Sequence, residues 1–341
     1  MILIFGASYG ILASCKFLLA GYDVLCVCKK DEEEILNENG FSINIPGYLN
    51  TKLNIKSQTL QGKFKAIQPK NINLNNIKLV ILAMQEAQYE DSKISSILFE
   101  IAKKKIPTIS IMNIPPSIYL KKFDVSNLND LEDIYVNNKS WKKFDQNFIT
   151  HASADPQIFK PNTAKINDVY VRLASNFKVA DFEDIESSKI LKEISDKIKL
   201  TRIVIENKSF RVPVNFNIYK SKFVPISKWP MIITGNYRCL ENKKLRSINE
   251  AVNEDLEYSK KIYNDVYNLC KKMGANDKDL IKFETYLKAS KSLNAPSSVS
   301  RQAYSGNKNF ERMDKLILFF SKKNNVKITD LEKILDNFNQ I

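Results

Sequence analysis

Residues 1–19 read MILIFGASYGILASCKFLL. Residues 1–5 are apolar and match a buried strand, whereas residues 11–19 carry an apolar helical pattern. Between them, Gly6 and Gly10 frame a turn of the kind that joins a strand to a helix. A second apolar run at residues 23–28 completes a strand–helix–strand unit. Such alternation predicts a parallel sheet with ligand sites at the carboxyl ends of its strands.

The alternation of strands and helices continues to about residue 200. Two segments interrupt it: residues 41–73 predict inserted strands or loops, and residues 123–165 predict a loop. The remaining predicted elements are strands at 79–84, 107–113 and 169–179, and helices at 89–104 and 185–198.

After about residue 208 the pattern becomes helical, with apolar side chains near the 3.6-residue spacing. Thr329 is placed to serve as the N-cap of the last helix. The predicted helices cover residues 226–239, 247–273, 277–293, 297–304, 314–321 and 329–338. A chain of 341 residues suits two domains, and we expect a boundary between residues 207 and 208.

Composition argues against several classes of protein. The formal charge is +14, but the lysines are scattered along the chain, so neither nucleic acid nor a membrane surface is predicted as a partner. The five cysteines are odd in number and lack metal-ligand spacing, which argues against disulfides and against a metal site. The sequence has no signal-peptide pattern and no run of about 18 apolar residues. We expect a soluble, cytoplasmic protein that binds a small molecule, and its oligomeric state stays open, a homodimer included.

The turn at residues 6–10 is the candidate nucleotide site. The N–H groups at the start of a helix, together with its dipole, can bind a pyrophosphate, and glycine permits close approach of the phosphates. Gly6, Ser8, Tyr9 and Gly10 are therefore predicted to contact the cofactor. The spacing departs from G-x-G-x-x-G, because Ser8 stands where the middle glycine is expected.

The end of the second predicted strand bears on the choice of cofactor. NAD-binding enzymes usually place an acidic residue there, whereas the 2′-phosphate of NADP requires cations. The strand ends at Cys28 and is followed by Lys29 and Lys30, which favours NADP; Asp31 leaves NAD open. The chain is thus predicted to be an α/β protein with a Rossmann domain at residues 1–207 and a mostly α-helical catalytic and substrate-binding domain at 208–341.

Taken together, these motifs resemble the ketopantoate reductase family, part of the 6-phosphogluconate-dehydrogenase-like enzymes that also include opine dehydrogenases. The stretches that carry the resemblance are residues 6–19, 29–43 with ILNENGF at 35–41, 79–113 and 228–314. The resemblance implies reduction of a small, anionic 2-oxo acid or related ketone by NADPH.

By the same resemblance, Lys29 matches a phosphate-binding basic residue and Asn113 matches an asparagine beside the nicotinamide. The family usually continues that asparagine with glycine, whereas Ile-Pro-Pro follows here at 114–116. Lys228 matches the catalytic lysine, which protonates the developing alkoxide; desolvation can bring the pKa of a lysine into the range of a general acid.

The resemblance also implies substrate contacts in the second half. Asn236, eight residues after Lys228, is expected on the same helical face and orients the substrate. Ser298 matches a serine that contacts the substrate carboxylate, and Glu311 matches a glutamate that binds a substrate hydroxyl and the lysine. The interval between serine and glutamate is one residue longer than in the family, so Ser297 is an alternative.

Two further residues are weighed from their chemistry alone. Arg301 follows Ser298 by about one turn, and its guanidinium suits a carboxylate, although a surface salt bridge is the commoner role. His151 is the only histidine, and Asp155 lies nearby; we expect it in a loop, lining or flanking the site rather than in catalysis.

Two other functions stay open. An opine-type dehydrogenase would condense a 2-oxo acid with an amino acid and would need a pocket for that second substrate. A non-catalytic, NAD(P)-binding regulator would keep the fold without turnover.

Overall fold

The computed structural model describes residues 1–46, 52–153, 158–159, 164–171, 175–205, 208–211 and 214–340. The chain forms two compact units, each built from several stretches of sequence. The first unit holds residues 1–84, 88–119 and 139–220, and the second holds residues 85–87, 120–138 and those from 221 on. The boundary predicted at residue 208 concerns functional domains and stays a prediction.

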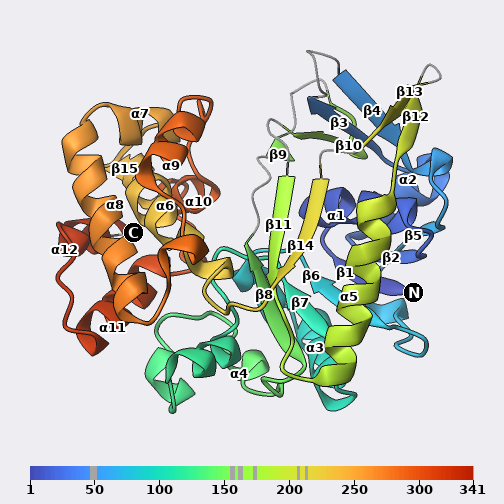
Figure 1. The fold of residues 1–341 in the computed structure, drawn as a ribbon, viewed down its shortest axis with the longest axis horizontal. Coiled ribbons are helices and arrows are strands. Elements are labelled where there is room, and N and C mark those ends of the chain that lie inside the picture. The colour runs from blue at the N-terminus through green and yellow to red at the C-terminus, as the bar shows by residue number, and fades with distance from the viewer. Residues whose placement is uncertain are drawn as a thin grey trace. The chain divides into compact units, whose positions relative to one another are not determined.

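An eight-stranded sheet forms the centre of the first unit (Figure 1). Its six parallel strands lie in the order β5-β2-β1-β6-β7-β8, so the chain runs outward from β1 in both directions, as in a Rossmann sheet. β11 pairs antiparallel with β8, and β14 pairs parallel with β11. The strands are β1 (Ile2–Phe5), β2 (Val24–Val27), β5 (Phe64–Ile67), β6 (Leu79–Leu82), β7 (Thr108–Ser110), β8 (Ile149–Ser153), β11 (Ser175–Ala180) and β14 (Val214–Tyr219).

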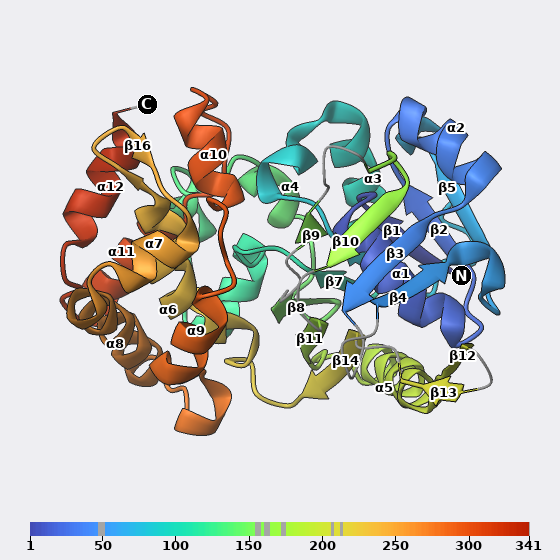
Figure 2. The ribbon, with the colours of Figure 1, turned by 90° about the horizontal axis from the view of Figure 1, so that it is seen from above.

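Helices cover both faces of this sheet because right-handed crossovers that run in opposite directions from β1 place their helices on opposite sides. Figure 2 shows α3 on one side of the strands and α5 on the other. The helices are α1 (Tyr9–Leu19), α2 (Lys30–Asn39), α3 (Ser92–Lys103) and α5 (Ile185–Leu200), with the short α4 (Asn138–Trp141) where the chain re-enters this unit. The apolar faces of α1 and α5 join the fully buried strands β1 and β6 in one hydrophobic core.

Smaller sheets accompany the central one. The strands β4 (Lys52–Lys56), β3 (Ser42–Pro46), β10 (Asp168–Val171) and β9 (Ile158–Phe159) form a second sheet in that order. The hairpin of β12 (Ile203–Ile205) and β13 (Lys208–Phe210) follows α5. The strands expected within residues 41–73 are therefore confirmed as β3, β4 and β5.

Two sequence expectations for this unit are wrong. Residues 123–165 are not a loop throughout, because β8 is a buried strand of the central sheet. The single strand expected at 169–179 is two strands in different sheets, β10 and β11, and residues 172–174 between them lie outside the described residues. A buried strand with few β-branched residues, such as ITHAS, carries little local pattern, and only its neighbours in the sheet identify it.

The second unit is mostly helical, as predicted. Its helices are α6 (Trp229–Met231), α7 (Ile248–Asn253), α8 (Leu256–Lys272), α9 (Phe283–Ser290), α10 (Ser298–Tyr304), α11 (Met313–Lys323) and α12 (Leu331–Asn339), with a hairpin of β15 (Leu240–Glu241) and β16 (Lys244–Leu245). The helix expected at 247–273 is broken, since Asp255 caps a new helix by accepting from the N–H of Tyr258. Asp330, not Thr329, is the N-cap of α12; the hydroxyl of Thr329 donates to Asp265 instead, at 2.7 Å.

Candidate active site

The turn after β1 lies where the strand order of the sheet reverses, the place where ligands bind in open α/β folds. Gly6 has a φ of +104° and donates its N–H to the carbonyl of Val27 at 3.0 Å. A Cβ on Gly6 would lie 2.9 Å from the carbonyl oxygen of Ala83, just after β6. Only glycine therefore fits between the ends of the two central strands.

The remaining turn residues begin helix α1. Ser8 is its N-cap and Tyr9 its first residue, and both are half-buried. A Cβ on Gly10 would approach a methyl carbon of Ile4 to 2.6 Å, so Gly10 lets the helix pack closely on β1. Because the first N–H groups of any helix have no partner within it, this end of α1 can bind an anion.

Both lysines predicted to contact the cofactor follow β2 after a single residue, Cys28. Lys29 is the N-cap residue of α2 and Lys30 is its first residue, and both side chains are exposed. Glu32 holds the start of this helix by accepting from the N–H of Lys29 at 3.1 Å. Asp31, the residue that leaves NAD open, is exposed in the same turn.

Asn113 and His151 occupy the far half of the same sheet. Asn113 is half-buried, three residues beyond the end of β7. His151 is 1% exposed in the middle of β8, so its expected place in a loop is wrong. Its Nδ1 lies 2.8 Å from the hydroxyl of Ser110 on the neighbouring strand. Burial lowers the pKa of His151 from 6.5 to about 3, and the imidazole is neutral at physiological pH.

In the second unit, Lys228 ends the 3₁₀ segment Pro225–Lys228 and is half-buried between buried neighbours, Ser227 and Trp229. The helical segment that continues from it is not a regular α-helix, because α6 passes into a π-helix, Ile232–Asn236. The expectation that Asn236 shares a face with Lys228 relied on α-helical spacing and does not apply here. π-Helical turns occur frequently at functional sites.

Close packing at Gly235 accompanies the π-helix. A Cβ there would lie 1.9 Å from the hydroxyl of Tyr286, which donates to the carbonyl of Met231 at 3.3 Å. Gly235 is thus a packing residue within the helical segment, and it has no positive φ.

The candidate substrate residues of the second unit are brought together by hydrogen bonds to the main chain. Asn236 ends the π-helix, and its carbonyl accepts from the hydroxyls of both Ser297 and Ser300 at 2.7 Å. Ser297 is also the N-cap of α10, accepting from the N–H of Ser300 at 3.2 Å. Ser298, the first residue of that helix, is half-buried. Arg301 is exposed and donates to the carbonyl of Pro296 at 2.7 Å.

Glu311 is 4% exposed at the residue before the N-cap of α11. The hydroxyl of Tyr237 donates to its carbonyl at 2.5 Å and accepts from the N–H of Met313 at 2.9 Å. Arg312 pairs with the buried Asp314 through two parallel bonds, with a shortest distance of 2.7 Å. Sequence reasoning missed Tyr237 and Ser300, and no local signal marks either of them.

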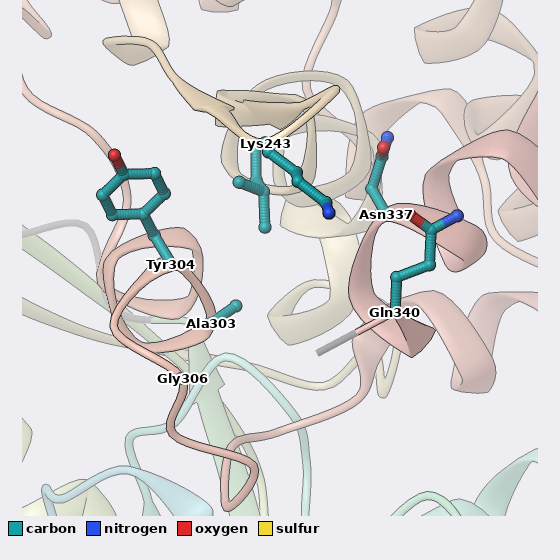
Figure 3. Close-up of a pocket in the computed structure, with 7 residues that line it drawn as sticks. Lys243, Ala303, Tyr304, Gly306, Asn337 and Gln340 are labelled. Atoms are coloured by element: carbon teal, nitrogen blue, oxygen red, sulfur yellow. The ribbon is translucent and has the colours of Figure 1, made fainter.

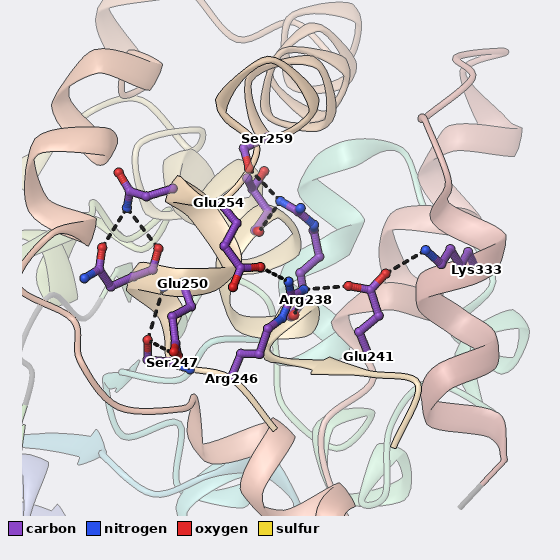
Figure 4. Close-up of polar contacts among 11 residues, drawn as sticks. Arg238, Glu241, Arg246, Ser247, Glu250, Glu254, Ser259 and Lys333 are labelled. Atoms are coloured by element: carbon purple, nitrogen blue, oxygen red, sulfur yellow. Dashed lines mark hydrogen bonds and ion pairs between the residues drawn. The ribbon is translucent and has the colours of Figure 1, made fainter. Parts of the chain in front are cut away.

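Arg238, which follows Tyr237 in the chain, stabilises the second unit. Its guanidinium is buried and donates to the hydroxyl of Ser259 at 2.7 Å (Figure 4). The guanidinium also lies over the ring of Tyr258. Arg246 bridges Glu241 and Glu254 at 2.6 and 2.5 Å, which ties the β15–β16 hairpin to α7. These contacts of Arg238 and Arg246 stabilise this part of the unit.

A cavity of about 230 Å³ lies in the second unit (Figure 3). Its lining comprises Leu240, Lys243, Ala303, Tyr304, Gly306, Asn337 and Gln340, and so includes none of the candidate site residues. Within the described parts of the chain, no cluster of His, Cys, Asp and Glu has the arrangement of a metal site. No helix among those same residues is long and apolar enough to span a membrane.

Comparison with known proteins identifies the fold. No protein-family model matches the sequence, and no curated protein matches it. Solved structures do match. A D-mandelate dehydrogenase in a ternary complex with NADH and anilino(oxo)acetate is 14% identical, with a TM-score of 0.63, and the match covers 100% of this chain and 98% of that one.

Two reductases match to a similar extent. The 2-dehydropantoate 2-reductase of Geobacter metallireducens GS-15 is 12% identical, with a TM-score of 0.65 and coverage of 100% of this chain and 99% of that one. The dimeric ketopantoate reductase of Staphylococcus aureus is 9% identical, with a TM-score of 0.59 and coverage of 99% and 97%. At these identities the likeness shows the fold, and the resemblance predicted from sequence is confirmed at that level: the chain has the ketopantoate reductase fold, shared with D-mandelate dehydrogenase, over its full length.

Proposed function

We propose that the chain is an NADPH-dependent oxidoreductase that reduces a small 2-oxo acid, or a related ketone, to the hydroxy acid. The observation that carries the proposal is the Gly6 turn at the point where the strand order reverses, in a chain that matches reductases of this type over its full length. Residues 1–207 would bind the cofactor, and residues 208–341 would supply the acid and the substrate contacts.

The residues of the first unit suit a dinucleotide. The positive φ of Gly6 lets the chain turn tightly from β1 into α1, and the start of α1 offers N–H groups to a pyrophosphate. Lys29 and Lys30 are exposed shortly after β2, where a 2′-phosphate is read, which favours NADPH over NADH. When bound, the nicotinamide supplies the hydride. Asn113 is assigned to the nicotinamide and to the reacting carbonyl.

The residues of the second unit are assigned to the substrate. Lys228 acts as the general acid that gives a proton to the alkoxide oxygen, and its half-buried position beside Trp229 suits that role. Glu311 binds the substrate hydroxyl and orients Lys228. Ser298, at the N-terminus of α10, binds the substrate carboxylate, with Asn236 and Arg301 as further substrate contacts.

The hydrogen bonds favour Ser298 over Ser297 for the carboxylate. The hydroxyl of Ser297 is engaged twice, as donor to the carbonyl of Asn236 and as acceptor for the N–H of Ser300 at the start of α10.

The proposal also places the protein in the cytoplasm, since its five cysteines are free and buried. It includes a homodimer, to be tested by light scattering.

The test is a panel of 2-oxo acids with NADPH and NADH, applied to the protein and to three variants. Lys228→Ala is expected to abolish reduction while NADPH binding, followed by fluorescence, is retained. Lys228→Arg keeps the charge but cannot give up its proton, so it should also be inactive. Lys244→Ala, which removes an exposed lysine of the same unit, should keep full activity.

Each outcome selects one function. Unchanged turnover in Lys228→Ala would eliminate the proposed acid. Reduction that requires an added amino acid would identify an opine-type dehydrogenase. Binding of NADPH without turnover on any 2-oxo acid would favour a non-catalytic regulator.

A further inference from the structure

Two consecutive residues, Asn236 and Tyr237, hold the main chain beside both Ser298 and Glu311. We infer that Tyr237 and Ser300 are positioning residues: Tyr237 fixes the backbone of Glu311, and Ser300 fixes the helix start that carries Ser298, both relative to the helical segment that begins at Lys228. This inference rests on the proposed function, because it concerns the arrangement of that same site.

The contact to α10 follows from the way the helical segment ends. Asn236 is the last residue of the π-helix and the N-cap of the short 3₁₀ helix that follows, Tyr237–Cys239. Its carbonyl is satisfied by two hydroxyls from a helix more than sixty residues away, those of Ser297 and Ser300, both at 2.7 Å. Ser298 lies between them in sequence, so its backbone is held on both sides.

The contact to Glu311 follows from the next residue. Tyr237 is 0% exposed, and its hydroxyl accepts from the N–H of Met313 and donates to the carbonyl of Glu311. The two bonds span Arg312, so they fix the backbone on both sides of it. Burial, and then the nearby Asp314 and Glu311, raise the pKa of Tyr237 well above 10, which keeps the hydroxyl protonated as a donor.

A buried carboxylate acts only where its backbone places it. The neighbouring residue, Arg312, is held by the carboxylate of Asp314 and by the side chain of Asn339, the latter at 2.8 Å. Because Tyr237 bonds the backbone of Glu311 and not its side chain, loss of the Tyr237 hydroxyl changes the position of the carboxylate and leaves its chemistry intact. Displacements of about 1 Å at a reacting centre can lower a rate by about 100-fold.

The test compares Tyr237→Phe with Tyr263→Phe. Tyr263 is also 0% exposed, and its hydroxyl donates to a main-chain carbonyl, that of Ile281, at 2.7 Å. Its ring packs against Phe283 and Tyr286, which are not candidate site residues. We expect Tyr237→Phe to lower kcat by about 10- to 100-fold with little change in KM. It should also shift the pH profile of kcat/KM, because the environment of the Glu311 carboxylate changes. Tyr263→Phe should leave kcat, KM and the profile within about twofold of the parent.

The second comparison reads the contact to Ser298. Ser300→Ala removes one of the two hydroxyls on the carbonyl of Asn236, and its expected effect is a rise in KM with little change in kcat, because Ser298 contacts the substrate carboxylate. Ser290→Ala is the matched control, since Ser290 is equally buried and donates to the carbonyl of Leu287 at 2.9 Å. Equal effects of each variant and its control, on the same kinetic parameter, would overturn the inference.

Hydrogen exchange separates this inference from the proposed function. The amide of Met313 should exchange faster in Tyr237→Phe than in the parent or in Tyr263→Phe, whether or not the protein reduces any 2-oxo acid. A parent protein without reductase activity would refute the proposed function. The exchange data would then still show whether Tyr237 holds the backbone at Glu311 and Met313. An active parent whose Tyr237→Phe variant keeps its kcat would overturn the positioning role and leave the proposed function standing.

Discussion

Replacing Gly6 with alanine tests the turn on which the cofactor assignment depends. The φ of +104° at Gly6 lies outside the region that an alanine can adopt without strain, and its Cβ would lie 2.9 Å from the carbonyl of Ala83. The side chain of Met84 lies equally close, but it can move, whereas the backbone of the sheet cannot. Backbone strain and a fixed clash should therefore add.

Gly21→Ala is the matched control in the same unit. Gly21 also has a positive φ, +78°, but the nearest atoms to its Cβ, at 3.2 to 3.5 Å, belong to the flexible, exposed side chain of Gln61. The left-handed conformation costs a non-glycine residue about 1–2 kcal/mol. Overpacking against a rigid neighbour adds about 1–3 kcal/mol. We expect a loss of about 1–2 kcal/mol for Gly21→Ala and about 2–5 kcal/mol for Gly6→Ala.

The assay is urea unfolding, with the free energy obtained by linear extrapolation. Because the chain has two compact units, tryptophan fluorescence and far-ultraviolet circular dichroism should be recorded together, to show whether the transitions coincide. NADPH affinity is measured in parallel: it should fall at least about tenfold for Gly6→Ala, the factor that corresponds to 1.4 kcal/mol, and stay within about twofold for Gly21→Ala. Equal losses of stability in both variants would refute the reasoning from the clash, and unchanged NADPH affinity in a folded Gly6→Ala would refute the assignment of the turn.

Three further predictions concern pH, ion pairs and cofactor choice. The pKa of His151 is about 3 in the folded protein and 6.5 in the unfolded chain, so the unfolded state takes up the proton first as the pH falls. The stability that neutral His151 provides is therefore present above pH 6.5 and is lost as the pH falls toward 3. Urea unfolding should show a loss of about 2 kcal/mol between pH 7 and pH 5, at about 1.4 kcal/mol per pH unit below 6.5, and a weaker pH dependence in His151→Gln. Arg246→Met removes a partly buried guanidinium from two carboxylates and should lower the free energy of unfolding by about 1–3 kcal/mol. Lys189→Met removes an exposed ion pair with Glu186 and should change the free energy of unfolding by less than about 0.5 kcal/mol. Thermal unfolding of the two variants makes the comparison. A Lys29→Ser, Lys30→Ser double variant should lose affinity for NADPH and keep its affinity for NADH, as measured by fluorescence titration; a parallel loss of both would contradict the phosphate role.

Local pattern predicted the elements that carry their own signal. The apolar strand at the start of the chain, the glycine turn and helix α1 follow one another within residues 1–19, and each is recognised from adjacent residues alone. The helix at 185–198 is confirmed as α5, whose N-cap Asp184 accepts from the N–H of Ser187. These features depend on spacing along the chain, which the sequence states directly.

Other predictions failed where a distant partner decides the local structure. Thr329 has the chemistry of an N-cap, but Asp265, on α8, accepts its hydroxyl proton. His151 lies in a stretch without clear periodicity, and its place in β8 depends on pairing with β7 and β11. Helical periodicity predicted a helix at 226–239, yet contacts such as that between Gly235 and Tyr286 accompany a π-helix there.

Neighbouring residues were enough to predict an α/β protein, a glycine turn that suits a dinucleotide, and a helical second half. The folded chain was needed to see that Gly6 faces the end of β6, that Ser297 donates to the carbonyl of Asn236, and that Tyr237 holds the backbone of Glu311. The two groups of features differ in the range of the interactions that produce them. Periodicity and capping act over a few residues, whereas these last two contacts join residues 61 and 74 positions apart, which meet only after the core has packed.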